Sequence, residues 1–172
     1  TGNAGNDTFN VDAGSDTISD LATGDILVVS AGATATANNV AGFVATAATS
    51  NAGSATLNAV AGGGSIDMTL AGGANGFTLA GGAGADTLVG SANVDTITGG
   101  ADDDTLTGKA GNDALTGNAG NDTFNVDAGS DTISDLATGD ILVVSAGATA
   151  TANNVAGFVA TAATSNAGSA TL

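Results

Sequence analysis

The chain has 172 residues, a net charge of −16 at pH 7 and a single cation, Lys109. This acidic excess excludes nucleic acid as a partner, because binding to a phosphate backbone requires Lys and Arg side chains that displace its counterions. With no His, Cys or Tyr, the chain also lacks the usual general base, the thiol nucleophile and the ligands of transition metals, so we expect no enzymatic activity.

The apolar content is small for an ordinary core. Leu, Ile, Val and Phe together supply 35 of the 172 residues, a fraction near the limit at which chains stop burying enough apolar surface to fold. No apolar run reaches the roughly 18 residues that a membrane span needs. All 17 acidic residues are Asp. Asp among many Gly is typical of a solvated acidic tail or of oxygen ligands for a hard cation, and the spacing of the Asp residues distinguishes the two.

Residues 1–27 contain three Asp residues that are nine apart, Asp7, Asp16 and Asp25. The same spacing returns later in the chain over a longer stretch. We therefore interpret residues 1–27 as the end of a repetitive β segment, that is, as a partial repeat unit.

Residues 28–71 form an Ala/Thr/Ser-rich linking segment without the nine-residue spacing. Alternating apolar residues within 65–70 predict a strand that leads into the next repetitive segment. The spacing of Val40, Phe43, Val44 and Ala47 also fits a short helix, but Gly42 and the Thr content disfavour one. Extended structure is the favoured prediction for the linking segment.

Residues 72–143 carry the clearest short period. An Asp recurs every nine residues, a large apolar residue follows each Asp by two positions, and Gly recurs at the same interval. A disordered acidic segment does not require apolar residues in register with its Asp residues, so the register indicates a fold. The pairs are Asp86 with Leu88, Asp95 with Ile97, Asp104 with Leu106, Asp113 with Leu115, Asp122 with Phe124, Asp131 with Ile133 and Asp140 with Leu142.

Residues 116–172 repeat residues 1–57 without a single change, 115 residues further along the chain. Residues 144–172 are therefore the start of a second linking segment. A repeat of this length predicts a tandem array, and we expect the chain to be an internal part of a longer protein.

The nine-residue period has a structural explanation. A strand of three residues, such as 105–107, turns its middle side chain toward the interior, and Gly-rich turn residues then reverse the chain. Two nonapeptides make one complete coil. The Asp residues then fall on two edges of the stack, Asp86, Asp104, Asp122 and Asp140 on one and Asp95, Asp113 and Asp131 on the other.

Carboxylates stacked in this way need a counter-charge. Neighbouring coils lie about 4.8 Å apart, and bare carboxylates at that distance repel by roughly 3 to 4 kcal/mol per pair at an effective dielectric of about 20, or about 1 kcal/mol when solvated. Calcium between the coils replaces this repulsion by coordination, because it accepts about six to eight oxygens from carboxylates and carbonyls. Folding and metal binding are then one event.

The repeat has the pattern GGxGxDxUx, where U is a large apolar residue, and its clearest copies begin at Gly81, Gly108 and Gly117. This pattern resembles the RTX (repeats-in-toxin) family of calcium-binding nonapeptide repeats. The resemblance implies an all-β fold, a right-handed parallel β-roll or β-solenoid with calcium-binding Gly/Asp turns, interrupted by the Ala/Thr-rich β linking segments. Residues 131–142, DTISDLATGDIL, also resemble the segment that closes the roll in serralysin-type proteases and in surface-layer proteins.

The resemblance further implies several calcium ions and their ligands. Turns that are two nonapeptides apart face each other in pairs that begin at 81 and 99, 90 and 108, 99 and 117, and 108 and 126, which gives about four ions. The turns with Asn93 and Val94, with Asp102 and Asp103, with Val126 and with Asp135 depart from the pattern. The implied ligands are Asp86, Asp95, Asp104, Asp113, Asp122, Asp131, Asp7 and Asp16, with the turn glycines Gly81, Gly84, Gly99, Gly108, Gly111, Gly117 and Gly120.

Other polar residues have simpler interpretations. Lys109 is expected to be a surface charge that eases local repulsion. Thr residues beside the apolar positions are typical of a solvated strand face. The alternative is that rows of Thr form a docking face for another chain or, less favoured, for ice. Five further Asp residues are expected to be solvated turn residues, with additional ligands as the alternative, namely Asp12, Asp20, Asp67, Asp127 and Asp135.

Three classes of function are compatible with these features. The favoured one is an extracellular structural protein, a calcium-stabilised repeat segment of a surface layer, filament or adhesin stalk that associates with itself. The alternatives are an adhesive module that binds a cell-surface glycan, and a secretion and folding roll attached to an enzyme elsewhere in a longer chain. The resemblance implies type I secretion and folding in millimolar calcium outside the cell, where weak sites are filled.

Overall fold

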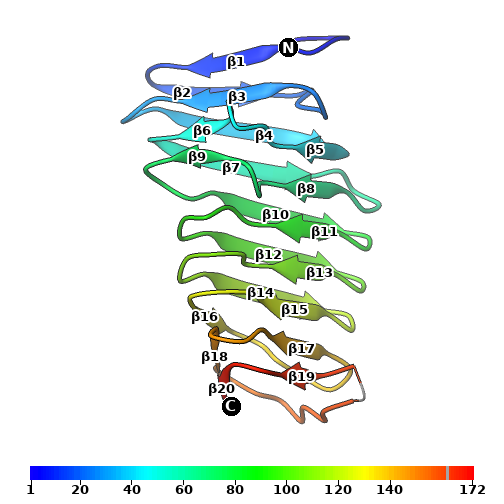
Figure 1. The fold of residues 1–172 in the computed structure, drawn as a ribbon. Coiled ribbons are helices and arrows are strands. Elements are labelled where there is room, and N and C mark those ends of the chain that lie inside the picture. Colours follow the sequence, from blue (N-terminus) through cyan, green and yellow to red (C-terminus); the bar gives the residue numbers. More distant parts are fainter. Residues whose placement is uncertain (162) are drawn as a thin grey trace.

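The chain forms a column of stacked, flattened β coils in a computed structural model that describes residues 1–161 and 163–172 (Figure 1). The N terminus lies at one end of the column and the C terminus at the other. All regular elements of the described residues are strands, and all strand pairs are parallel. The predicted all-β solenoid is confirmed. In the described chain no helix is long and apolar enough to cross a membrane.

Three sheets run along the column. One sheet contains nine strands in the order β2-β4-β7-β10-β12-β14-β16-β18-β20, a second contains seven in the order β19-β17-β15-β13-β11-β8-β5, and a third contains four in the order β1-β3-β6-β9. The strands are β1 (Thr8–Val11), β2 (Ser15–Ile18), β3 (Ile26–Val29), β4 (Thr34–Val40), β5 (Gly42–Val44), β6 (Ser50–Asn51), β7 (Ser54–Ala59), β8 (Ser65–Asp67), β9 (Gly72–Gly73), β10 (Thr78–Ala83), β11 (Thr87–Val89), β12 (Thr96–Ala101), β13 (Thr105–Thr107), β14 (Ala114–Ala119), β15 (Thr123–Val126), β16 (Ser130–Ile133), β17 (Ile141–Val144), β18 (Thr149–Ala152), β19 (Ser165–Asn166) and β20 (Ser169–Thr171).

Each coil of the repetitive segment contains two nonapeptides, as the spacing of the Asp residues predicts. Thr78 pairs with Thr96 and Thr96 with Ala114 in the nine-stranded sheet, and Thr87 pairs with Thr105 in the seven-stranded sheet. Short Thr-rich strands place every second side chain inside. The predicted apolar positions are all buried: Leu88, Ile97, Leu106, Leu115, Phe124, Ile133 and Leu142.

The strands differ in length between the two sheets of the roll. β11 and β13 have three residues, as predicted, but β10, β12 and β14 have six and continue through the first turn residues. Gly82 pairs with Gly100 and Ala83 with Ala101. Because Gly and Ala have little or no side chain, the turn backbone stays close enough to its neighbour to extend the ladder.

The linking segment continues the solenoid with wider coils. Each of its coils has three strands, such as β4, β5 and β6, one from each sheet. The wider interior is filled by large buried side chains that include Phe43, Leu57 and Met68. The alternating pattern of residues 65–70 holds for Ile66 and Met68, but Leu70 lies in the turn after β8 and is 61% exposed.

One sequence repeat corresponds to a whole number of coils. Strand pairing aligns one residue from each successive coil, in the order Thr17, Thr36, Thr56, Thr78, Thr96, Ala114 and Thr132. The last three coils contain two nonapeptides each, whereas the first three, which include the linking segment, are longer. Thr17 and Thr132 are equivalent positions of the two copies. Six coils therefore return the chain to the equivalent position of the nine-stranded sheet, whereas the equivalent strands β1 and β15 lie in different sheets.

The stacked apolar side chains give a prediction for stability. Leu106→Ala removes a fully buried side chain and should lower the free energy of unfolding in saturating calcium by about 2 to 5 kcal/mol, the usual cost of a buried Leu→Ala cavity. Leu70→Ala, at an exposed turn position, is the matched control and should change it by less than about 0.5 kcal/mol. Urea unfolding followed by circular dichroism measures both; equal effects would contradict the assigned interior.

Candidate metal centres

The Asp ladder lies along both edges of the roll, as its spacing predicts. Six of the predicted ligands are buried, each less than 3% exposed: Asp86, Asp95, Asp104, Asp113, Asp122 and Asp131. Burial of this kind is unusual for Asp unless a partner compensates the charge. The two edges thus hold rows of carboxylates that need a positive partner.

Each buried carboxylate is fixed by the preceding coil. The backbone N–H of Asp86 donates to Asp104 Oδ1 at 2.8 Å, and the N–H of Asp104 donates to Asp122 Oδ1 at 2.9 Å. On the other edge the N–H of Asp95 donates to Asp113 Oδ1 and the N–H of Asp113 to Asp131 Oδ1, at 2.8 and 3.0 Å. One oxygen of each carboxylate is therefore used in joining the coils.

The second oxygen is the one that can bind a cation. Among the described residues, buried Oδ2 atoms without any hydrogen-bond partner occur in Asp7, Asp86, Asp104, Asp113 and Asp131. An unpartnered buried carboxylate oxygen is costly. The number of these oxygens and their position inside the turns fit calcium, a hard cation that prefers oxygen ligands.

Glycine leaves room for the cation beside these oxygens. A Cβ atom at Gly108 would lie 2.6 Å from Asp113 Oδ2 and 2.8 Å from Asp131 Oδ2, so carboxylate oxygens of two turns that stack on the same edge converge on one point next to the backbone. Cβ atoms at Gly81, Gly99 and Gly117 would likewise collide with the carboxylates of their own turns. The other three predicted glycines, Gly84, Gly111 and Gly120, have positive φ and lie in the turns themselves.

Carboxylates alone do not complete a site. The described residues contain no group of three or more acidic side chains that could hold a metal ion together. Two carboxylates per site leave most of the coordination of calcium to backbone carbonyls. The turn backbone is therefore as much a part of the site as the Asp side chains, and a bound ion would link one coil to the next.

Burial also shifts the protonation of these groups. Desolvation raises the pKa of Asp104 to about 6, of Asp113 to about 7 and of Asp131 to about 6, with neighbouring carboxylates adding to the shift and backbone amides opposing it. Burial likewise raises the pKa values of Asp86, Asp95 and Asp122. Without a cation the folded roll thus favours neutral carboxyl groups.

The two remaining predicted ligands belong to the first copy of the repeat. Asp7 is half-buried and has an unpartnered Oδ2, as the Asp ligands of the roll do. Asp16 is exposed in β2, whereas the equivalent Asp131 is buried. The difference arises because the Asp113 turn covers Asp131, and no described turn covers Asp16 in this way.

Several Asp residues outside the predicted set cap turns. Asp135 accepts hydrogen bonds from the amides of Gly117 and Asn118, and Asp20 accepts one from Asn3. Asp140 accepts from the amides of Asp122 and Ala137, so both its oxygens are used. Sequence reasoning treated Asp20 and Asp135 as solvated. Asp20 and Asp135 lie 17 or 18 residues, about one coil, after the amides that they cap. This spacing is the sequence signal that could have identified them.

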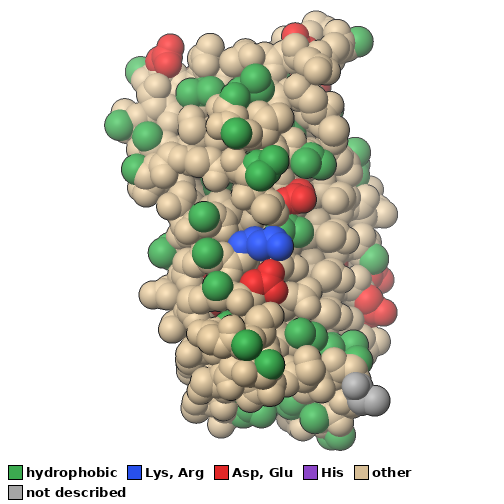
Figure 2. All heavy atoms as spheres, in the orientation of Figure 1, with side chains coloured by type: hydrophobic (Ala, Val, Ile, Leu, Met, Phe, Trp, Pro, Cys, Tyr) green, Lys and Arg blue, Asp and Glu red, His purple; other side chains and the backbone are tan. Residues whose placement is uncertain are grey.

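The single Lys is a surface charge, as predicted. Lys109 Nζ lies 3.4 Å from Asp127 Oδ2, and both side chains are more than a third exposed. Figure 2 shows this cation beside an acidic side chain on a face with few other charges. A solvated pair of this kind contributes little to stability.

The pKa values give a prediction for the calcium-free protein. In the unfolded chain these Asp groups titrate near pH 4, so between about pH 4 and 7 the calcium-free fold binds more protons than the unfolded chain, and its stability falls as the pH rises. We expect the β signal of calcium-depleted protein to be strongest near pH 4 to 5 and to weaken toward pH 8.

Calcium should remove this pH dependence, because the cation takes the place of the proton. Circular dichroism between pH 4 and 8, with and without millimolar calcium, measures both effects. A calcium-free signal that grows with pH would contradict the assigned carboxylates.

Comparison with known proteins agrees with the geometry. The family model described as RTX calcium-binding nonapeptide repeat (4 copies) matches residues 1–33, 78–106 and 98–133. No curated protein and no solved structure matches the chain. The matched segments cover just over half of the 172 residues and include the buried Asp ladder. The chain therefore belongs to the RTX family of calcium-binding nonapeptide-repeat proteins.

Proposed function

We propose that the chain is a segment of an extracellular structural protein, in which calcium stiffens a long tandem array of a surface layer, filament or adhesin stalk and no catalysis takes place. RTX repeat proteins are typically secreted, and calcium binding suits the extracellular space. The observation that carries the proposal is that one sequence repeat makes six whole coils. Successive copies then stack in phase, and an array of any length is one continuous column.

The proposal defines how much each sequence repeat adds to the length of the array. Neighbouring parallel strands are about 4.8 Å apart, so six coils extend a rod by about 29 Å per repeat. A rod of this kind has strand-to-strand hydrogen bonds along its whole axis. Calcium at the turns would remove the carboxylate repulsion that opposes stacking.

Length gives the first test of the proposal. A protein extended by one sequence repeat should be about 29 Å longer in calcium than the present chain, and both should lose their rod shape in excess chelator. Small-angle X-ray scattering measures the maximum dimension. Scattering of the longer chain that fits two compact domains joined by a flexible linker, and not a longer rod, would contradict a continuous column.

The nine-stranded sheet offers a face for lateral association with a second copy. Its strand pairs align one outward row, Thr17, Thr36, Thr56, Thr78, Thr96, Ala114, Thr132, Thr151 and Thr171. This row carries no charge in a chain of net charge −16. Two columns could therefore approach through these rows without setting carboxylates against each other. By contrast, Thr107 on the other sheet is buried.

Substitution in the Thr row tests lateral association. Thr78→Lys with Thr96→Lys introduces charges at two adjacent exposed positions and should abolish assembly of tandem-repeat protein in calcium, while the fold persists. Thr87→Lys, at an exposed position of the seven-stranded sheet, is the control and should assemble normally. Sedimentation velocity measures assembly and circular dichroism the fold; unchanged assembly of the double variant would end the proposed lateral contact.

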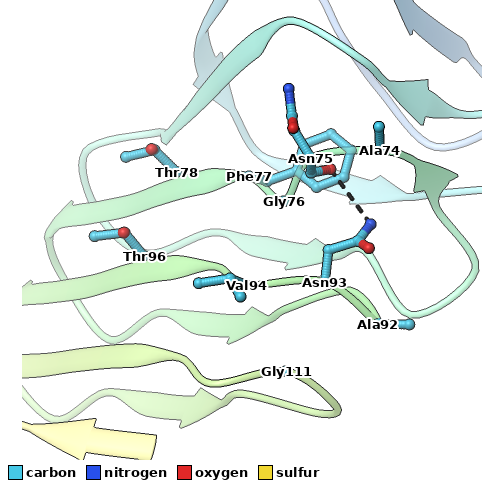
Figure 3. A pocket seen from close by; sticks show the side chains of 10 residues that line it. All are labelled: Ala74, Asn75, Gly76, Phe77, Thr78, Ala92, Asn93, Val94, Thr96 and Gly111. Atoms are coloured by element: carbon cyan, nitrogen blue, oxygen red, sulfur yellow. Dashed lines mark hydrogen bonds between the residues drawn. The ribbon is translucent and has the colours of Figure 1, made fainter.

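Glycan binding is the second candidate function. A hollow of about 580 Å³ lies where the linking segment meets the roll, and its lining includes Asn75, Asn93, Thr78 and the exposed Val94 (Figure 3). Amide and hydroxyl groups beside an apolar side chain are suited to a sugar ring. Binding of the calcium-loaded chain to a glycan panel, lost on Asn93→Ala, would favour this function over a purely structural one.

A further inference from the structure

The turn of residues 90–95 differs from its neighbours in backbone conformation. In five other nonapeptide turns the second and fourth positions both have positive φ, between 69° and 145°, but neither Ser91 nor Asn93 does. Left-handed residues at alternate positions determine where the turn carbonyls point. Since carbonyls supply most of the calcium ligands, this turn does not present the same ligand set. The five turns have the pairs Asn3 and Gly5, Gly82 and Gly84, Gly100 and Asp102, Lys109 and Gly111, and Asn118 and Gly120.

The carboxylate of this turn is already satisfied by protein atoms. Asp95 Oδ2 accepts hydrogen bonds from the Ser91 amide at 2.6 Å and from Ser91 Oγ at 3.0 Å. Asp95 Oδ1 accepts from the Phe77 amide at 2.6 Å. Both side chains, Ser91 and Asp95, are fully buried. Asp86, Asp104 and Asp113, in contrast, each have a buried Oδ2 with no partner.

The preceding turn on the same edge provides no second carboxylate. Residues 72–77 align with the repeat, but Phe77 occupies the position of the Asp and is buried. Asn93 Nδ2 instead joins the two turns by donating to the carbonyl of Asn75 at 3.3 Å (Figure 3) and to that of Gly73 at 3.4 Å. These turns are thus joined by hydrogen bonds from Asn93 and by the bond from the Phe77 amide to the single carboxylate of Asp95, whereas two carboxylates meet in the turns further along.

We propose that the turn of residues 90–95 binds no calcium and that Ser91 stabilises the Asp95 carboxylate in place of the ion. The expected site between the turns that begin at 90 and 108 is then absent, and on this edge the row of ions begins with the pair Asp113 and Asp131. The proposal rests on calcium binding by the neighbouring turns. It makes the first coil of the roll a calcium-independent junction with the linking segment.

Ion counting tests the proposal directly. Asp95→Asn should leave the number of bound calcium ions unchanged, whereas Asp113→Asn, the matched change one coil further along the same edge, should remove at least one. Equilibrium dialysis with atomic emission measures the number of ions per chain. Loss of an ion on Asp95→Asn with the fold retained would overturn the proposal. A wild-type chain that binds no calcium would instead overturn the calcium assignment itself.

A second variant tests the proposal by gain of a site. Ser91→Gly with Asn93→Gly restores the glycines of the repeat pattern, removes the Ser91 hydroxyl from Asp95 Oδ2 and allows positive φ at both positions, so it should add one ion. Ser91→Ala removes only the hydroxyl, so the ion count should stay constant while the melting temperature in chelator falls. An unchanged ion count in the double glycine variant, with normal circular dichroism in calcium, would show that Ser91 and Asn93 do not decide whether this turn binds the metal.

Discussion

The structure of the roll depends on the burial of one carboxylate in each nonapeptide turn from residue 81 onward. Each Asp uses one oxygen to accept a backbone amide of the preceding coil, so the carboxylates cannot leave the edge without breaking the stack. The other oxygen is left without a partner in Asp86, Asp104, Asp113 and Asp131. A proton or a divalent cation can compensate such a group. Because the raised pKa values of Asp104, Asp113 and Asp131 are only about 6, 7 and 6, a proton does not fully compensate these groups at neutral pH. We expect calcium to be the partner there, so that folding depends on the calcium content of the medium.

The two kinds of coil solve the problem of a sparse interior in different ways. A roll coil of two nonapeptides has room inside for one large side chain from each strand, such as Ile97 and Leu106, and it joins its neighbours through its charged turns. A linking coil has a third strand and a wider interior that accommodates Phe43 and Met68. It has no Asp ladder. Apolar burial thus holds the linking coils, whereas we expect the roll coils to need the ion as well. The turn of Ser91 and Asp95 lies where the two kinds of coil meet.

Much of this architecture could be predicted from the sequence, because it follows from one local rule repeated every nine residues. The buried position of Leu106 and the edge position of Asp104 depend only on the alternation of a short strand and on the length of a turn. Other features depend on contacts between coils. Contacts between neighbouring coils determine the exposure of Leu70, the length of the six-residue strands and the presence of the third sheet. No local sequence pattern shows which segments of neighbouring coils stack on each other. The role of Ser91 was missed for the same reason: the GS dipeptide differs little from GG, and only the folded turn places its hydroxyl on Asp95.

The length of the repeat shows how the linking segment and the roll fit together. The repeat unit does not contain a whole number of nonapeptides. If every coil consisted of two nonapeptides, the second copy would therefore begin at a different point of the coil from the first. The longer linking coils absorb the difference, and equivalent residues Thr17 and Thr132 fall in one row. An insertion of one residue in a linking coil is tolerable when a turn can hold it, but it must leave the number of coils whole. What must be conserved is a whole number of coils per sequence repeat, and the number of residues in each coil can vary. Coils of different length can therefore alternate in one column.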